Sequence, residues 1–209
     1  GLGRLTAAHC RATESMARAV QAGVDLLEHA EFLAADGQLR YDAQLAAAMR
    51  DRGTFASPTL QAWTGYPQVA ALAALQAEGT ISAEQQRTLA EWERRAEPRL
   101  DLVRRMLDSG LKELIVPGTD CGVGNLAFGG MEGELELLCR VGFTPAEALL
   151  AATCRSARAI GMADQIGTVE AGRIADLAVF RGDPTADLRA LRQVVAVVQA
   201  GAIVRASDQ

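Results

Sequence analysis

The residues RLTAAHCRATESMARAVQAGVDLLEH, numbered 4–29, carry the clearest signal of the fold in this chain. The short apolar runs at 4–8 and 24–27 are typical of β-strands, and residues 12–22 between them repeat apolar side chains at helical spacing. Gly23 is the expected end of that helix, because glycine adopts the left-handed conformation that closes many helices. This order predicts two parallel strands joined by a right-handed crossover.

The same unit is repeated further along the chain. Residues 41–52 are predicted to form a helix that ends at Gly53, and residues 54–57 a strand that stops at Pro58. A further strand is expected at 114–116. Repeated β-then-α units predict an α/β fold with a parallel sheet. Because a complete (β/α)₈ barrel typically needs about 250 residues, these units are expected to form only part of a TIM barrel.

A polar insertion at 67–109 interrupts this alternation. It is predicted to contain two helices, the second beginning at Ser82 with a capping box to Gln85. Pro98 is expected to kink or break that helix. The alternating acidic and basic residues of the insertion indicate a solvated helix face with ion pairs four residues apart.

The C-terminal part changes from helical to β character. Residues 131–161 are predicted to form two helical pieces, the second capped by Thr144, whereas 174–180 and 194–204 read as short β-runs. These runs are expected to form a small separate sheet. The sequence therefore predicts two domains, a partial barrel at 1–162 and part of a small β-domain at 163–209.

Composition excludes several classes of protein. The net charge of −5 comes from interspersed charges, which gives no basic patch for nucleic acid. No apolar run reaches the roughly 18 residues of a membrane span, and the four cysteines form neither a CxxC motif nor a plausible disulfide framework. The expected partner is a small-molecule substrate, with no nucleic acid and no membrane. Because the first residue is Gly1 rather than Met, localisation is left open.

Both histidines of the chain follow predicted strands. His9 and His29 are each placed at the C-terminal end of a strand, with one strand–helix–strand unit between them. Consecutive parallel strands lie about 4.8 Å apart, so these side chains are expected to converge on one ion. The C-terminal rim of a barrel is also where active sites are built. We therefore predict that both histidines are metal ligands rather than one packed and one surface histidine.

Asp120 ends the last predicted strand, between flexible glycines. A carboxylate at this rim can bind a metal and accept a proton from water, but an Asx turn or a helix N-cap explains it equally well. Cys10 and Cys121 adjoin His9 and Asp120, and neighbouring residues of an extended strand point to opposite sides. Both cysteines are therefore expected to pack rather than to bind metal.

Weaker candidates lie at the same rim. Thr59, Gly122 and Asn125 are possible substrate contacts, although loop structure alone explains each of them. Glu28 is expected to point away from the site and to form a salt bridge in the barrel wall.

Several motifs together resemble the amidohydrolase superfamily, especially its imidazolonepropionase-like and its Xaa-Pro or Xaa-Arg dipeptidase-like members. The motifs occur in the family's order along almost the whole chain. They are TAAH (6–9), GVDLLEH (23–29), PGTD (117–120), GFTPAEAL (142–149), AAT (151–153) and IGTVEAGRIADL (166–177).

This resemblance implies the C-terminal half of a TIM barrel, strands 5–8, with the last strands of a small β-sandwich domain. It also implies a metal-dependent hydrolase that cleaves C–N bonds of amides, cyclic amides, dipeptides or carbamates by a metal-activated hydroxide. His9 and His29 would bind a divalent ion, most often zinc. The complete enzyme would hold one or two such ions. Asp120 would bind metal and act as the general base.

The departures from the family pattern suggest incompleteness. The first-strand His-x-His motif and the fourth-strand bridging residue have no counterpart, so we expect a fragment, or one part of a split enzyme, that is inactive alone. A homo-oligomer or pairing with a missing N-terminal half is the expected assembly. Two alternatives are a non-catalytic half-barrel subunit and a complete zinc hydrolase that uses only His9, His29 and Asp120.

Overall fold

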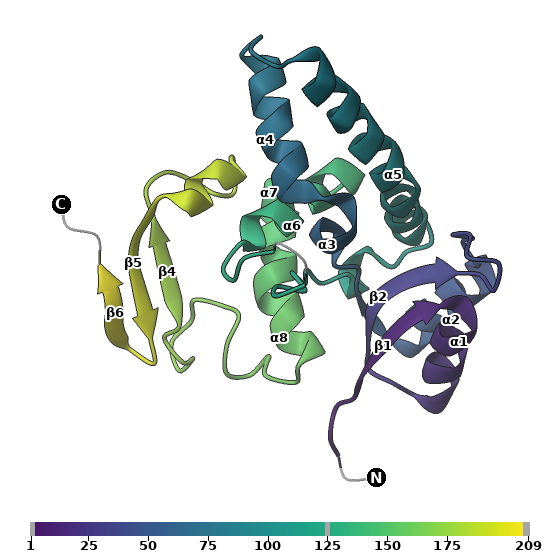
Figure 1. The fold of residues 1–209 in the computed structure, drawn as a ribbon. Coiled ribbons are helices and arrows are strands. Elements are labelled where there is room, and N and C mark those ends of the chain that lie inside the picture. The colour runs from purple at the N-terminus through teal and green to yellow at the C-terminus, as the bar shows by residue number, and fades with distance from the viewer. Residues whose placement is uncertain (1–2, 124–125, 207–209) are drawn as a thin grey trace.

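The first sheet of the computed structural model, which describes residues 3–123 and 126–206, contains three parallel strands. Their order is β1 (Ala7–Ala12), β2 (Leu26–Leu33) and β3 (Phe55–Ser57). Figure 1 shows this sheet at one end of the molecule, beside α1 and α2. The predicted parallel α/β arrangement is confirmed.

Strands β1 and β2 start and end later than the sequence predicted. They begin at Ala7 and Leu26 and continue past both histidines, because backbone pairing extends beyond the apolar runs. His9 lies opposite Glu28, and Cys10 lies opposite His29. The two histidines are therefore offset by one residue along their strands.

The first two helices end where the sequence predicted. Helix α1 spans Thr13–Ala22 and helix α2 spans Ala43–Arg52. The glycines that follow, Gly23 and Gly53, have φ angles of 81° and 70°, and their N–H groups bond to carbonyls of the last turn. Glycine adopts this left-handed conformation without the steric cost of a Cβ.

The strand predicted at 114–116 is wrong. Lys112–Leu114 forms a short 3₁₀ turn, η1, and Ile115 makes a single parallel bridge to Ala56 of β3. The Val116 N–H also donates to the Ala56 carbonyl at 3.0 Å. Pro117 follows at once and has no N–H to donate, so the pairing with β3 stops there and does not form the expected fourth strand.

The insertion contains two helices, as predicted, α4 (Tyr66–Ala77) and α5 (Ala83–Asp108). A short helix that was not predicted, α3 (Leu60–Thr64), precedes it. The capping box between Ser82 and Gln85 is confirmed at the start of α5. The described part of the chain contains no helix that is both long and apolar enough to cross a membrane.

Pro98 does not break α5, which is continuous from Ala83 to Asp108. An interior proline costs about 3 kcal/mol, because it removes a backbone hydrogen bond and its ring crowds the preceding turn. Leu100, Val103 and Met106, which follow Pro98, are at most 2% exposed. Burial of each such side chain contributes roughly 1.5–3 kcal/mol, which is enough to hold the helix together.

The C-terminal third contains a helical segment and a second sheet. The helical elements are α6 (Met131–Val141), α7 (Pro145–Leu150), the π-turn η2 (Ala151–Arg155) and α8 (Ser156–Ala159). Thr144 caps α7 as predicted, through a capping box with Glu147. The predicted small separate sheet is confirmed, and it is antiparallel. Its strands are β4 (Leu177–Phe180), β5 (Val194–Gln199) and β6 (Ala202–Ala206). The short 3₁₀ turn η3 (Leu188–Arg192) comes just before β5.

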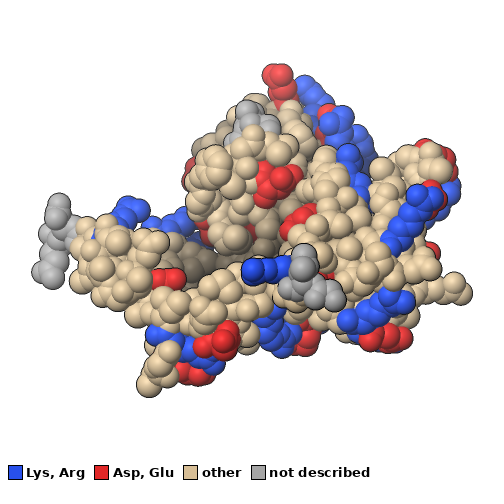
Figure 2. All heavy atoms as spheres, turned by 90° about the horizontal axis from the view of Figure 1, so that it is seen from below, with Lys and Arg blue, Asp and Glu red and all other residues tan. Residues whose placement is uncertain are grey.

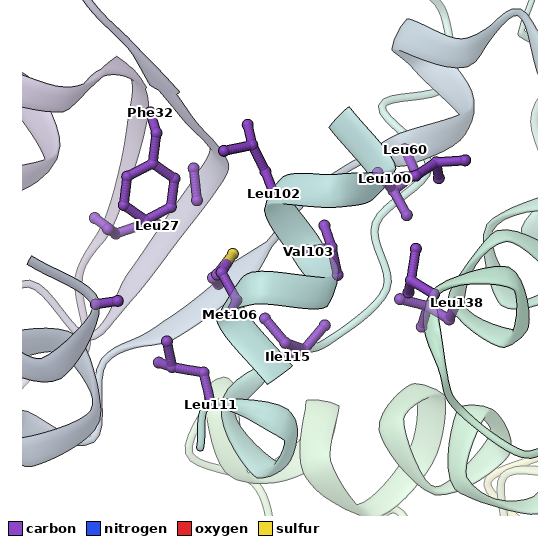
Figure 3. Close-up of a cluster of buried hydrophobic side chains, with 14 of the residues drawn as sticks. Leu27, Phe32, Leu60, Leu100, Leu102, Val103, Met106, Leu111, Ile115 and Leu138 are labelled. Carbon is purple, nitrogen blue, oxygen red and sulfur yellow. The ribbon is translucent and has the colours of Figure 1, made fainter. Parts of the chain in front are cut away.

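Helix α5 lies at the centre of the core. Figure 3 shows Leu102, Val103 and Met106 of this helix between Leu27 of β2 and Leu138 of α6. All five side chains are at most 5% exposed. The insertion is therefore an integral layer that joins the parallel sheet to the C-terminal helices.

Candidate metal and catalytic site

The two histidines are in direct contact. His9 Nδ1 and His29 Nε2 are 2.9 Å apart, and the ring centroids are 4.5 Å apart at an interplanar angle of 72°. His9 is exposed on β1, whereas His29 is buried on β2. The two side chains therefore converge, and their role as ligands of one ion stays a prediction.

The backbone turns out of the regular strand conformation at His29. Its φ angle is +71°, and the next residue, Ala30, has φ +44°. Regular pairing with β3 ends one residue earlier, at Glu28 opposite Ser57. A non-glycine residue in this region costs roughly 1–2 kcal/mol. Such strain is common at functional sites, where the surrounding structure fixes the position of a side chain.

Thr59 holds the other nitrogen of the His29 ring. Its Oγ1 lies 2.8 Å from His29 Nδ1, and its side chain is buried at the start of α3. Thr59 also has a positive φ, +47°, which is unusual for a β-branched residue. The threonine that the sequence placed among the weaker candidates therefore contacts a central residue of the site.

Glu134 of α6, which sequence reasoning missed, supports this strained turn. Its two carboxylate oxygens accept hydrogen bonds from the Leu60 N–H and the Gln61 N–H, both at 2.8 Å. The side chain is completely buried, and burial raises the pKa of Glu134 to about 7 although both N–H groups oppose that rise. Each such hydrogen bond contributes about 0.5–1.5 kcal/mol, which offsets part of the strain at Thr59. An acidic residue on the otherwise apolar face with Leu138 and Val141 was the available sequence signal.

The surroundings of His29 favour a neutral imidazole. Burial lowers the pKa of His29, and the adjacent His9 lowers it further. The negative charges of Asp120, Glu31 and Glu28 act in the opposite direction. A neutral ring retains the lone pair that a metal ion requires.

Asp120 lies close enough to influence His29 by its charge, and it too has a positive φ, +49°. Gly118, two residues before Asp120, lies tightly against β3, because a Cβ there would lie 2.2 Å from Ser57 Oγ. Of the weaker candidates nearby, Gly122 is exposed with φ +93°, and Asn125 lies outside the described residues.

The neighbouring cysteines and Glu28 take different roles. Cys10 is 4% exposed within the core, as predicted for a packing residue, and Cys121 is a half-buried free thiol. The salt bridge predicted for Glu28 is not found among the described residues. Instead Glu31 is the buried acid of this wall, and it pairs with Arg11 at 3.1 Å. The positive φ angles at 29 and 30 interrupt the alternation on which the prediction for Glu28 relied.

A charged layer lies directly beyond the histidines. Arg11 follows His9 by two residues, and Glu31 follows His29 by two residues. The Arg11 guanidinium lies 4.3 Å from the Trp63 ring centroid, and Arg99 of α5 lies 5.3 Å from the same ring. Arg99 is also 3.8 Å from Glu31. Figure 2 shows that acidic and basic groups are interspersed over the face seen there.

The two histidines fit a divalent cation as two of its ligands. Imidazole nitrogens suit zinc, and two of them in a tetrahedral site lie about 3.3 Å apart, close to the observed 2.9 Å. The contact of His29 Nδ1 with Thr59 fixes the ring, as a hydrogen bond to the second nitrogen does in metal-binding histidines. Within residues 3–123 and 126–206, however, no three His, Cys, Asp or Glu side chains form a group that could hold a metal. Asp120 does not complete a three-ligand site in this structure.

Comparison with known proteins places these features in a family. The amidohydrolase family model matches residues 2–204. An imidazolonepropionase from Geobacillus kaustophilus (strain HTA426) is 40% identical over 78 residues, which cover 37% of this chain and 18% of the relative.

Solved structures agree over nearly the whole chain. A protein described as a prolidase from Bifidobacterium longum has a TM-score of 0.74 and 32% identity, with 99% of this chain and 48% of that one covered. A Xaa-Pro dipeptidase with bound methionine has a TM-score of 0.72 and 26% identity over 97% and 45% of the two chains. The chain therefore spans about half the length of these structures, as expected for half of a TIM barrel with part of a small β-domain. The family model covers all but a few residues, and the chain belongs to the amidohydrolase family.

Proposed function

We propose that this chain supplies one half of the active site of a metal-dependent hydrolase of C–N bonds. The observation that carries the proposal is the 2.9 Å contact between His9 Nδ1 and His29 Nε2 on adjacent parallel strands. Members of the amidohydrolase superfamily generally use divalent metals, and zinc is one of the metals that imidazole ligands suit. A second ion in the complete enzyme is part of the proposal.

Three residues share the chemistry in this proposal. His9 and His29 would hold the cation, which would supply Lewis-acid polarisation of the substrate carbonyl. Asp120 would also hold the cation. Its carboxylate would accept a proton from the attacking water and pass it to the leaving nitrogen. Thr59 orients the His29 ring, and Gly122 lines the substrate pocket.

The proposed substrates are amides, cyclic amides, dipeptides or carbamates. The relatives named imidazolonepropionase, Xaa-Pro dipeptidase and prolidase support this range. Arg99 supports an anionic group on the substrate, because its ion pair with Glu31 is long, at 3.8 Å, and its buried Nε makes no hydrogen bond to the described residues. A guanidinium binds a carboxylate in a bidentate manner, through two parallel N–H···O hydrogen bonds. The charged layer beyond the histidines would therefore hold the acidic end of a dipeptide-like substrate.

Activity of the whole enzyme requires more chain in this proposal. The match to about half of each solved relative supports pairing with an N-terminal half that brings the remaining ligands. The alternative, a non-catalytic half-barrel subunit, is supported by exposed apolar side chains near the small sheet. They are Val169, Ile203 and Val204, which are 86%, 70% and 58% exposed.

The test is the metal content of the purified chain after gel filtration, measured by elemental mass spectrometry. Wild type is expected to retain stoichiometric zinc or manganese, His9→Ala to lose it, and Cys121→Ser to retain it as the matched control. Asp120→Asn is expected to weaken retention less than His9→Ala does. A folded chain that elutes as an oligomer without metal would refute the proposal and favour the structural subunit.

A further inference from the structure

Glu134 is engaged entirely with backbone. Its Oε1 accepts the Leu60 N–H, its Oε2 accepts the Gln61 N–H, and the residues involved are separated by more than 70 positions in sequence. No Lys, Arg or His in the described part of the chain forms an ion pair with this carboxylate. A completely buried acid without a cationic partner is costly, so its two hydrogen bonds indicate a specific task.

These two N–H groups belong to the turn that presents Thr59. Helix α6 is pressed closely against this turn, because a Cβ on Gly133 would lie 2.5 Å from the Tyr66 ring and 2.7 Å from Gln61 Oε1. Leu60 follows Thr59 directly, and Thr59 has the strained left-handed backbone. A shift of the Glu134 carboxylate would therefore move the Thr59 hydroxyl.

The Thr59 hydroxyl in turn meets His29 Nδ1 at 2.8 Å. If Nδ1 carries the proton of the ring, it donates to Thr59 Oγ1, and Nε2 presents its lone pair toward His9. We propose that Glu134 is a positioning residue which, by holding Thr59, keeps His29 in the tautomer protonated on Nδ1. The purpose of this arrangement rests on the proposed function, but the tautomer is a property of the metal-free chain.

The tautomer is read from long-range ¹H–¹⁵N correlations of the histidine rings in the ¹⁵N-labelled, metal-free full chain. Only two histidines are present, so a His9→Asn variant assigns both sets of signals. The variants are Glu134→Gln and Thr59→Val. Glu136→Gln is the matched control, because Glu136 lies on the same helix but contacts Tyr66 and Arg192.

Wild type and Glu136→Gln are expected to show His29 protonated on Nδ1. Glu134→Gln and Thr59→Val should each lower the ratio of the Nδ1–H to the Nε2–H form by about threefold or more. The double variant should match Thr59→Val alone, since Glu134 acts through Thr59. His29 protonated on Nε2 in wild type, or unchanged His29 signals in a folded Glu134→Gln chain, would overturn the inference.

Glu134→Asp is the second variant if Glu134→Gln does not fold, because it only withdraws the carboxylate by one methylene. Altered Leu60 and Gln61 amide signals with unchanged His29 signals in this variant would equally refute the inference. Zinc retention of the same samples separates the two proposals. A wild-type chain that binds no zinc overturns the proposed function, while the tautomer ratios still decide the role of Glu134.

Discussion

The stability of the chain should depend on pH through Glu134. Burial raises the pKa of this carboxyl group from 4.5 to about 7 in the folded chain. Because the folded state holds the proton more tightly than the unfolded state, this group stabilises the fold below pH 4.5. That contribution is lost as the pH rises through 7. A rise of this size corresponds to about 3 kcal/mol of unfolding free energy.

The assay is urea unfolding of wild type and Glu134→Gln at half-unit intervals between pH 4 and pH 8.5. Glutamine does not titrate, so the difference in unfolding free energy between the two proteins isolates Glu134 from all other groups. We expect wild type to lose about 3 kcal/mol relative to the variant between pH 4.5 and pH 8. A difference that stays constant over this range would refute the reasoning, because it would show that burial does not raise the pKa of Glu134.

Two further predictions concern packing and charge near the site. Gly118→Ala should destabilise the chain by about 1–3 kcal/mol in thermal unfolding, because the new Cβ would lie 2.2 Å from Ser57 Oγ. Gly130→Ala is its control, since the nearest atom there is 3.7 Å away, and equal stability of the two variants would contradict the close approach. Glu31→Gln should cost about 1–2 kcal/mol in urea unfolding, because Glu31 is 3% exposed and pairs with Arg11. Glu91→Gln removes an exposed pair with Arg95 and should cost less than about 0.5 kcal/mol, so equal losses in the two variants would argue against a buried ion pair.

Local signals predicted the elements of this fold well. Helix ends at Gly23 and Gly53 and helix starts at Ser82 and Thr144 follow from hydrogen bonds within a few residues. The strand–helix–strand order also placed His9 and His29 on neighbouring strands. These features are determined by the sequence because the interacting groups are close together along the chain.

Two predictions of local structure failed, for different reasons. Pro98 favours a break, but the apolar residues after it keep α5 continuous by packing into the core. The 114–116 segment has strand character, but Pro117 and the preceding 3₁₀ turn leave it a single bridge to Ala56. Tertiary contacts therefore outweigh the local signal at Pro98, whereas neighbouring residues limit the pairing at 114–116.

The sequence by itself therefore determined the alternating α/β pattern, the family and the pair of histidines at one end of the parallel strands. Only the tertiary structure decided that Thr59 contacts His29 and that Glu134 supports the turn of Thr59. Thr59 lies 30 residues from His29, and Glu134 lies 74 residues from Leu60, so no local pattern relates them. Their contacts exist because α6 packs against the turn after β3, and a buried carboxylate is tolerated where two backbone N–H groups receive it.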